Sequence, residues 1–200
     1  MKKRRFGIFG GTFNPPHIAH VRVGMAFVEG AELDSLLIIP TNDPPHKLYS
    51  GSVSATDRFK LCELAFSGID KARVSDMEIA RGGKSYTVET LKALSSEDVE
   101  LYLLCGTDMF LSLDTWFMAE EIFKLATICF VRRELEEEYD AAIEKARKRY
   151  IDKYSASVLE IKSEVTVLSS TNVRERITLG DYSEIPEPVA EYIRERDLYT

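Results

Sequence analysis

The stretch that decides the fold is residues 6–20, FGIFGGTFNPPHIAH, near the start of the 200-residue chain. Phe6–Phe9 is a short apolar run that predicts a β-strand, and Gly10-Gly11 ends it. A polar turn follows, and the pattern from His17 to Glu29 predicts a helix. Two small residues between a strand and a helix let phosphate oxygens approach backbone N–H groups. This turn is therefore a candidate anion site.

Apolar runs and helical patterns alternate along the rest of the chain. The runs Leu101–Cys105 and Leu125–Val131 are apolar at nearly every position, which is typical of parallel strands covered by helices on both faces. The predicted fold class is therefore α/β, a Rossmann-like doubly wound parallel sheet. Extended segments are also expected at Leu36–Ile39, Arg73–Ile79, Val158–Ile161 and Val165–Leu168, and helices at Ala55–Phe66, Thr87–Leu94, Glu134–Tyr150, Ser170–Ile177 and Pro188–Arg196.

Composition and charge restrict the kind of protein. The length and 44% hydrophobic residues predict a single domain over residues 1–200 with a sizeable core. The formal charge of −7 argues against a broad nucleic-acid surface, so an anionic ligand must meet a local cluster. Apolar runs fall short of a membrane helix, and the basic start does not lead into a signal-peptide core. We expect no membrane partner and a cytoplasmic location, with Cys62, Cys105 and Cys129 as buried thiols.

Two histidines begin the first predicted helix. His17 and His20 are three residues apart, so both imidazoles lie on one face over the positive end of the helix dipole. Contact with a phosphate is the favoured interpretation, and core packing and a zinc pair are the alternatives. Zinc has little support, because His46 is the only other histidine and no cysteine is near in sequence.

A second polar cluster, residues 168–174 (LSSTNVR), opens a late predicted helix. Its hydroxyls can cap the helix or bind phosphate, and Arg174 lies one turn in. The alternative is an ordinary N-cap beside a surface arginine.

Both clusters resemble signatures of the nucleotidylyltransferase superfamily. Residues 12–20 are similar to S/T-x-x-P-x-H-x-G-H, with Ala19 in place of the glycine, a small residue that we expect to preserve close packing. Residues 168–174 are similar to I-S-S-T-x-I/V-R, with Leu168 in place of isoleucine. Two matching signatures in the proper order make coincidence improbable.

The resemblance implies an ATP site at these two signatures. It implies that a C-terminal helical portion, about residues 170–200, completes this site. It also implies Mg²⁺ that arrives with ATP and is held mainly by phosphates and water, with no dedicated metal ligands in the protein. Catalytic roles are implied for His17, His20 and Arg174, and contacts with ATP for Gly10, Gly11, Thr12, Phe13, His17, His20, Ser170, Thr171 and Arg174.

The middle of the chain is similar to the bacterial nicotinate-nucleotide adenylyltransferase family, a resemblance that extends to Tyr199 near the end. It implies transfer of AMP from ATP to nicotinate mononucleotide, which forms deamido-NAD and pyrophosphate by direct in-line transfer without a covalent intermediate. Contacts with nicotinate mononucleotide are implied for Lys47, Tyr86, Thr87, Asp108, Trp116 and Arg133.

Several of these interpretations have alternatives. Trp116 suits stacking on a pyridinium ring, and it also suits a half-buried core position. Asp108 could cap the helix that follows it, and only one of Arg132 and Arg133 needs to point inward. Pantetheine-phosphate, nicotinamide-mononucleotide and glycerol-phosphate nucleotidyltransferases share both signatures, and an inactive nucleotide sensor is a further alternative. The sequence leaves open a homo-oligomer.

Overall fold

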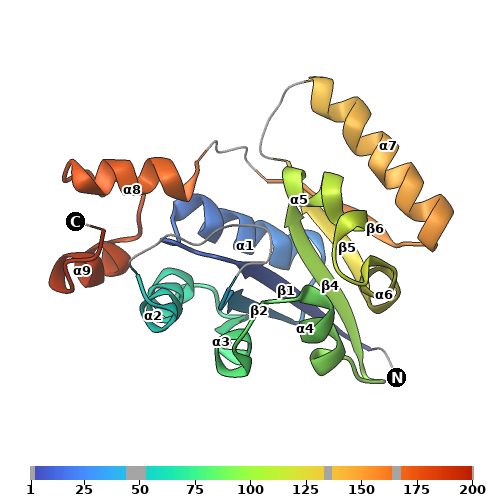
Figure 1. Cartoon of the computed structure of the whole chain (residues 1–200), viewed down its shortest axis with the longest axis horizontal. Coiled ribbons are helices and arrows are strands. Elements are labelled where there is room, and N and C mark those ends of the chain that lie inside the picture. Colours follow the sequence, from blue (N-terminus) through green and yellow to red (C-terminus); the bar gives the residue numbers. More distant parts are fainter. Residues whose placement is uncertain (1–2, 44–52, 133–136, 164–167, 200) are drawn as a thin grey trace.

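The computed structural model describes residues 3–43, 53–132, 137–163 and 168–199, and the described residues form a six-stranded parallel sheet between two layers of helices (Figure 1). The strands are β1 (Arg4–Gly11), β2 (Ser35–Pro40), β3 (Ala72–Val74), β4 (Val99–Gly106), β5 (Ala126–Val131) and β6 (Val158–Ile161). The helices are α1 (Ile18–Gly30), α2 (Ala55–Phe66), α3 (Met77–Arg81), α4 (Thr87–Leu94), α5 (Thr107–Ser112), the 3-10 helix η1 (Leu113–Thr115), α6 (Ala119–Leu125), α7 (Glu137–Tyr154), α8 (Ser170–Thr178) and α9 (Glu187–Glu195).

The order of the strands is β3-β2-β1-β4-β5-β6, and each neighbouring pair is parallel. The predicted doubly wound α/β class is confirmed. The chain proceeds outward from β1 through β2 to β3 and then returns to the other side of β1 to form β4. Ligands of open α/β sheets bind beyond the carboxyl ends of the strands where the order reverses in this way. The carboxyl end of β1 and the turn that follows it, residues 10–20, therefore lie at the expected binding edge.

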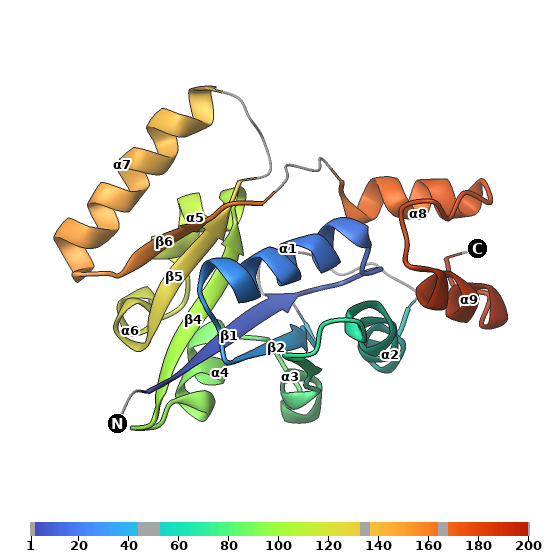
Figure 2. The ribbon, with the colours of Figure 1, turned by 180° about the vertical axis from the view of Figure 1, so that it is seen from behind.

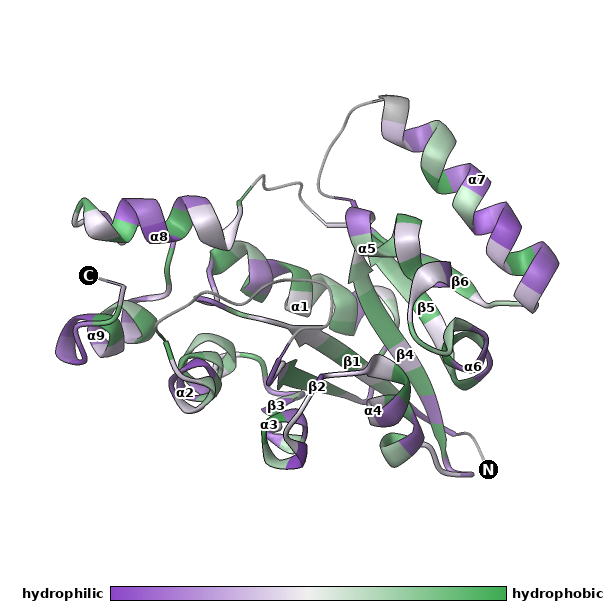
Figure 3. Cartoon of the chain, in the orientation of Figure 1, coloured by the Kyte–Doolittle hydropathy of each residue, from purple (hydrophilic) through white to green (hydrophobic). Residues whose placement is uncertain are grey.

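Each face of the sheet has its own apolar core. One core packs α1, α2, α8 and α9 against the sheet and includes Phe27, Phe66 and Val189. The other core includes Leu91 and Phe110 and lies under α4, α5, α6 and α7. Figure 2 shows α1 across one face of the sheet, and Figure 3 shows that the strands between the two layers are predominantly apolar. Each fully buried Leu or Phe stabilises the fold by roughly 1.5–3 kcal/mol.

Two small residues allow α1 to pack closely. A Cβ on Gly7 of β1 would lie 2.3 Å from Cδ1 of Leu33 and 3.0 Å from the ring of Phe27, so this strand position requires glycine. Ala19 in the first turn of α1 is buried. The small side chain at this position is therefore packed inside, as the sequence predicted.

One predicted extended segment is wrong over most of its length. Arg73–Ile79 was expected to be extended, but only Ala72–Val74 forms a strand and Met77–Arg81 forms α3. The buried carboxylate of Glu78 accepts a hydrogen bond of 2.6 Å from Oγ1 of Thr90 in α4. This contact between two elements favours a helical turn, and the short apolar pattern did not reveal it.

Other boundaries differ less. The helix predicted at Glu134–Tyr150 is α7, which continues to Tyr154, where the tyrosine ring stacks on Phe123 with centroids 4.6 Å apart. The strand predicted at Val165–Leu168 lies outside the described residues, apart from Leu168. The three cysteines are buried free thiols, as predicted, and burial raises the pKa of Cys105 to about 12. Within the described ranges, no helix has both the length and the apolar character needed to cross a membrane.

Candidate active site

The two histidines of the first signature lie side by side at the start of α1. His17 is the N-cap residue and His20 is in the first turn. Their ring centroids are 3.7 Å apart and the ring planes differ by 31°. His17 is only 3% exposed, whereas His20 is half-buried. His20 is therefore the better placed of the two to meet a ligand.

A backbone hydrogen bond orients the ring of His20. Its Nδ1 accepts a hydrogen bond of 3.2 Å from the backbone N–H of His17. A ring nitrogen that accepts a hydrogen bond carries no proton, so the proton of this neutral imidazole is on Nε2. The ring of Phe13 packs edge-on against the same imidazole, with centroids 5.1 Å apart. The Nε2–H group is thus a donor whose direction is fixed before any ligand binds.

The glycines before this turn differ in their surroundings. A Cβ on Gly10 would meet no described atom within 4 Å, so there is space beside this strand end. A Cβ on Gly11 would lie 3.1 Å from the ring of Phe13, so Gly11 makes room for that ring. Phe13 itself is buried against Phe9 and Phe66. Of the residues implied for ATP contact, Phe13 can therefore offer only its backbone, and its ring supports His20.

The second signature packs directly on the first. Oγ of Ser170 donates a hydrogen bond of 3.2 Å to the carbonyl of Pro15, and Nη1 of Arg174 donates one of 2.8 Å to the carbonyl of Asn14. Nη2 of Arg174 also lies 3.2 Å from Oγ1 of Thr171. Ser169, rather than Ser170, is the N-cap of α8. Arg174 is half-buried against the loop that leads to His17, so it is not an ordinary surface arginine.

No role was predicted for Tyr199, although it holds the same loop. Its hydroxyl donates a hydrogen bond of 2.7 Å to Oδ1 of Asn14, and both side chains are buried. A buried amide needs such partners. The carbonyl of Glu184 accepts a hydrogen bond of 3.0 Å from the backbone N–H of Ile18, so the C-terminal segment also contacts the start of α1. In the sequence, only Asn14 in the turn could have signalled this distant partner.

On the other side of β1, the loop after β2 is joined to the segment before α4. Asn42 donates its backbone N–H to Oγ of Ser85 and its side-chain amide to the carbonyl of Gly83, each at 2.9 Å. The backbone N–H of Ser85 donates in turn to the carbonyl of Asp43 at 2.9 Å. These bonds place Tyr86 at the start of α4, where its ring lies 4.7 Å from that of Phe117. Thr87 follows as the first residue of α4.

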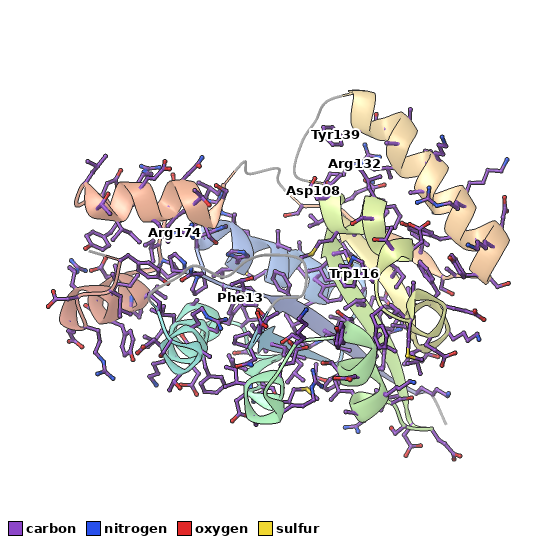
Figure 4. The ribbon with its side chains drawn as sticks, in the orientation of Figure 1. Phe13, Asp108, Trp116, Arg132, Tyr139 and Arg174 are labelled. Carbon is purple, nitrogen blue, oxygen red and sulfur yellow. The ribbon has the colours of Figure 1, made fainter. Side chains whose placement is uncertain are left out.

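The remaining residues implied for the acceptor come from separate elements. Asp108 is exposed in the first turn of α5, whose N-cap residue is Gly106, so Asp108 does not cap this helix. Trp116 is half-buried and packs against the second core. Figure 4 shows Asp108 and Arg132 at the same end of the sheet, with Trp116 further from it. The alternatives for Trp116 therefore both stand.

Of the two neighbouring arginines, Arg132 is held by carboxylates. Its guanidinium forms ion pairs with Asp140 of α7 and, at 2.7 Å, with Glu160 of β6. These contacts occupy Arg132 in joining two elements and raise its pKa. Arg133 and Lys47, both implied for the acceptor, lie outside the described residues.

The chain matches known proteins over nearly its whole length. The profile of the family described as Cytidylyltransferase-like matches residues 8–176. Proteins named "Probable nicotinate-nucleotide adenylyltransferase" from Desulfatibacillum aliphaticivorans and Listeria monocytogenes (serotype 4a, strain HCC23) are 35% and 33% identical, over 98% of this chain and 99% and 98% of their own lengths. The chain belongs to the nicotinate-nucleotide adenylyltransferase family. The family resemblance inferred from the two signatures and the middle region is confirmed.

Solved structures of nicotinate-nucleotide adenylyltransferases have the same fold. A Plasmodium falciparum nicotinic acid mononucleotide adenylyltransferase, solved in complexes with APC and with NaAD, has a TM-score of 0.73 to this chain. It is 16% and 15% identical in the two complexes, and the match covers 98% of this chain and 97% of that one. At this identity the likeness supports the architecture alone.

Acidic and histidine side chains do not assemble into a metal centre within the described ranges of this family member. No group of three or more His, Cys, Asp or Glu residues in that part of the chain could hold a metal ion. The side chains at the carboxyl end of β1 instead offer donors, namely the Nε2–H of His20 and the guanidinium of Arg174. A donor set of this kind suits an anion.

Proposed function

We propose that this protein transfers AMP from ATP to nicotinate mononucleotide, forming deamido-NAD and releasing pyrophosphate. The observation that carries the proposal is the contact between the two signatures. Ser170 and Arg174 of α8 bond to the carbonyls of Pro15 and Asn14, directly before the histidine pair of α1. Two sets of cationic and N–H donors, distant in sequence, thereby converge at the carboxyl end of β1, where an open α/β sheet binds its ligand.

The proposed reaction is an in-line attack of the nicotinate mononucleotide phosphate on the α-phosphorus of ATP. The nucleophile is already an anionic phosphate, so no general base and no covalent intermediate are needed. The protein aligns two polyanions and stabilises the charge that grows on the α-phosphate. Nε2–H of His20 donates to that phosphate, with His17 beside it and with Arg174 and Lys47 sharing the remaining charge.

The rest of the ATP site is proposed around the same turn. Backbone N–H groups for ATP come from Gly10, Gly11, Thr12 and Phe13. The first turn of α8 adds Ser170 and Thr171. Residues 170–200 belong, on this proposal, to the same single domain of residues 1–200, and they complete the ATP site. Tyr199 and Arg174 support this assignment because both bond to Asn14.

The acceptor is proposed to lie toward α4, α5 and η1. Tyr86 and Thr87 form one side of the pocket, Asp108 the second, and the ring of Trp116 faces the pyridinium. Arg133 is assigned to the acceptor because its neighbour Arg132 is paired with two carboxylates.

ATP enters this site with a divalent metal ion, which we propose to be Mg²⁺. When bound, such an ion would screen the charge of the phosphates, and phosphate oxygens and water would hold it. Buried free thiols support a reducing compartment, and we propose the cytoplasm.

A panel of acceptors tests the proposal. Purified protein is incubated with ATP, Mg²⁺ and one of four acceptors: nicotinate mononucleotide, nicotinamide mononucleotide, pantetheine phosphate or glycerol phosphate. Pyrophosphate release and the mass of the product are measured. We expect the fastest release with nicotinate mononucleotide and a product with the mass of deamido-NAD. A faster reaction with another acceptor would reassign the substrate, and no release with any of them would favour an inactive nucleotide sensor.

A further inference from the structure

A buried arginine outside both signatures joins the two sides of the site. Arg58 in α2 is 1% exposed and is the largest of the fully buried side chains in the described residues. Its Nη1 donates a hydrogen bond of 2.8 Å to the carbonyl of Thr12, and its Nη2 donates one of 3.3 Å to the carbonyl of Asn42. One guanidinium thus bonds to the loops that follow two neighbouring strands, β1 and β2.

Each of these loops leads to one side of the site. Thr12 precedes the turn that carries His17 and His20 at the nucleotide side. Asn42 bonds to Gly83 and Ser85, directly before Tyr86 on the acceptor side. The two loops also meet where the backbone N–H of Thr41 donates to the carbonyl of Gly11 at 2.9 Å. Arg58 is therefore buried where the nucleotide side and the acceptor side meet, and it hydrogen-bonds to the backbone of each.

The chemistry of the side chain matches this place. Removing a charge from water costs free energy, and an apolar side chain could fill the same volume at lower cost. A guanidinium, however, carries five N–H donors in a rigid planar fork, so it holds two carbonyl oxygens at a fixed separation. A lysine is a single flexible point charge and does not fix that separation. Fixing the distance between the two loops is the property that only arginine supplies.

We propose that Arg58 is a positioning residue for the attack on the α-phosphorus. It aligns the loop after β2, which leads to the acceptor side, with the loop after β1, which leads to the nucleotide side. The inference rests on the proposed adenylyl transfer for its kinetic consequence. This consequence follows because the phosphate of the acceptor and the α-phosphate of ATP must lie in line, and a displacement of about 1 Å can cost on the order of 10²-fold in rate. Because Arg58 bonds to both loops, its loss falls on their alignment.

Arg58→Lys is the first test. We expect kcat for deamido-NAD formation to fall roughly 10- to 100-fold while the KM for ATP changes less than about threefold. Arg58→Gln carries no charge to bury and is expected to show the same division between kcat and KM. The matched control is Arg5→Lys, because Nη1 of Arg5 donates to the carbonyl of Ala31 at the opposite end of β1. The control should keep the wild-type kcat.

Amide hydrogen exchange supplies a readout that needs no turnover. The backbone N–H of Thr41 donates a hydrogen bond between the two loops that Arg58 joins, and the backbone N–H groups of Asn42 and Ser85 donate hydrogen bonds that hold the loop after β2 to the segment before α4. Peptides that contain these amides should exchange faster in Arg58→Lys than in wild type or Arg5→Lys, while peptides from β5 should be unchanged.

The outcomes separate this inference from the proposed function. If wild-type protein makes no deamido-NAD, the proposed function fails, and the exchange data still decide whether Arg58 fixes the loops. Wild-type kcat in either folded Arg58 variant, or unchanged exchange at the three amides, would overturn the positioning role. Loss of the folded state in both variants would overturn it too, because Arg58 would then serve stability alone.

Discussion

The nucleotide side and the acceptor side of this site are built in different ways. On the nucleotide side, one continuous turn leads into α1 and is bonded to side chains of the C-terminal segment, with Tyr199, Arg174 and Ser170 all contacting residues 14–15. The residues implied for the acceptor that the structure describes come instead from α4, from α5 and from the end of η1, and near them Phe117 is 53% exposed.

The difference follows from what each side must do. Charge that develops on a phosphate is best stabilised by donors whose directions are fixed in advance, and hydrogen bonds between buried groups provide that rigidity. Recognition of an aromatic ring needs a face of suitable size, which partly exposed side chains on several elements can provide. Substitutions on the nucleotide side should therefore change kcat, and substitutions on the acceptor side should change KM.

The largest effect is expected at His20. His20→Ala removes the donor that we propose for the α-phosphate and should lower kcat by roughly 10²-fold or more, while the fold and much of the affinity for ATP remain. Steady-state rates of pyrophosphate release, with a thermal melt as a check on folding, measure this. Near-normal turnover in a folded variant would remove His20 from the mechanism.

Trp116→Ala examines the acceptor side. The loss of the aromatic face that we propose for the pyridinium ring should raise the KM for nicotinate mononucleotide by roughly tenfold and leave the KM for ATP within about twofold. Initial rates with each substrate varied in turn provide both constants. An equal rise in the two constants would assign Trp116 to core packing.

A smaller effect is expected from Tyr199→Phe, which removes one hydroxyl and its bond to Asn14. The free energy of unfolding should fall by about 1 kcal/mol, and kcat should fall by roughly threefold because the turn before His17 loosens. Tyr192→Phe is the matched control, since its hydroxyl bonds to Asp57 at 3.0 Å, between α9 and α2. We expect both variants to lose similar stability and only Tyr199→Phe to lose kcat. Equal kcat values in the two variants would contradict the role of Tyr199.

The smallest effect concerns Asp181, after α8. Its carboxylate accepts a hydrogen bond from the backbone N–H of Ser183 and pairs with Arg176, and these contacts lower its pKa from 3.8 to about 2. A carboxyl group whose pKa is lowered in the folded state stabilises the fold above its unfolded pKa, and this contribution is lost as the pH falls through the folded pKa.

The melting temperature of wild type should therefore exceed that of Asp181→Asn by a constant amount above about pH 5, and the difference should shrink as the pH falls from about 4 to about 2. Thermal melts of both proteins across this range measure it. A difference that does not vary with pH would show that the charge of Asp181, held by Ser183 and Arg176, contributes nothing to stability.

The parts of the molecule that were predictable from sequence are those with local causes. The buried parallel strands were recognisable because both of their faces are apolar, and the turn at residues 10–20 was recognisable because its glycines and histidines lie in one short stretch of sequence. Helix α3 was missed because its Glu78 is held by Thr90 of another element.

The contacts that support the site have no local signal. Arg58 meets Thr12 across 46 residues, and Tyr199 meets Asn14 across 185. In the sequence, Arg58 is one charged residue in an amphipathic helix, and nothing near it marks it as buried. Only the folded chain brings these partners together, so the residues proposed to bind a ligand had a signal in the sequence that the residues holding them in place lacked.

The most direct test of the account is a competition between two acceptors. Wild-type protein receives equal concentrations of nicotinate mononucleotide and nicotinamide mononucleotide with limiting ATP and Mg²⁺, and both dinucleotide products are quantified by mass. We predict that deamido-NAD forms in excess over NAD and that His20→Ala lowers both products together. NAD in equal or greater amount, or an unchanged yield from His20→Ala, would contradict it.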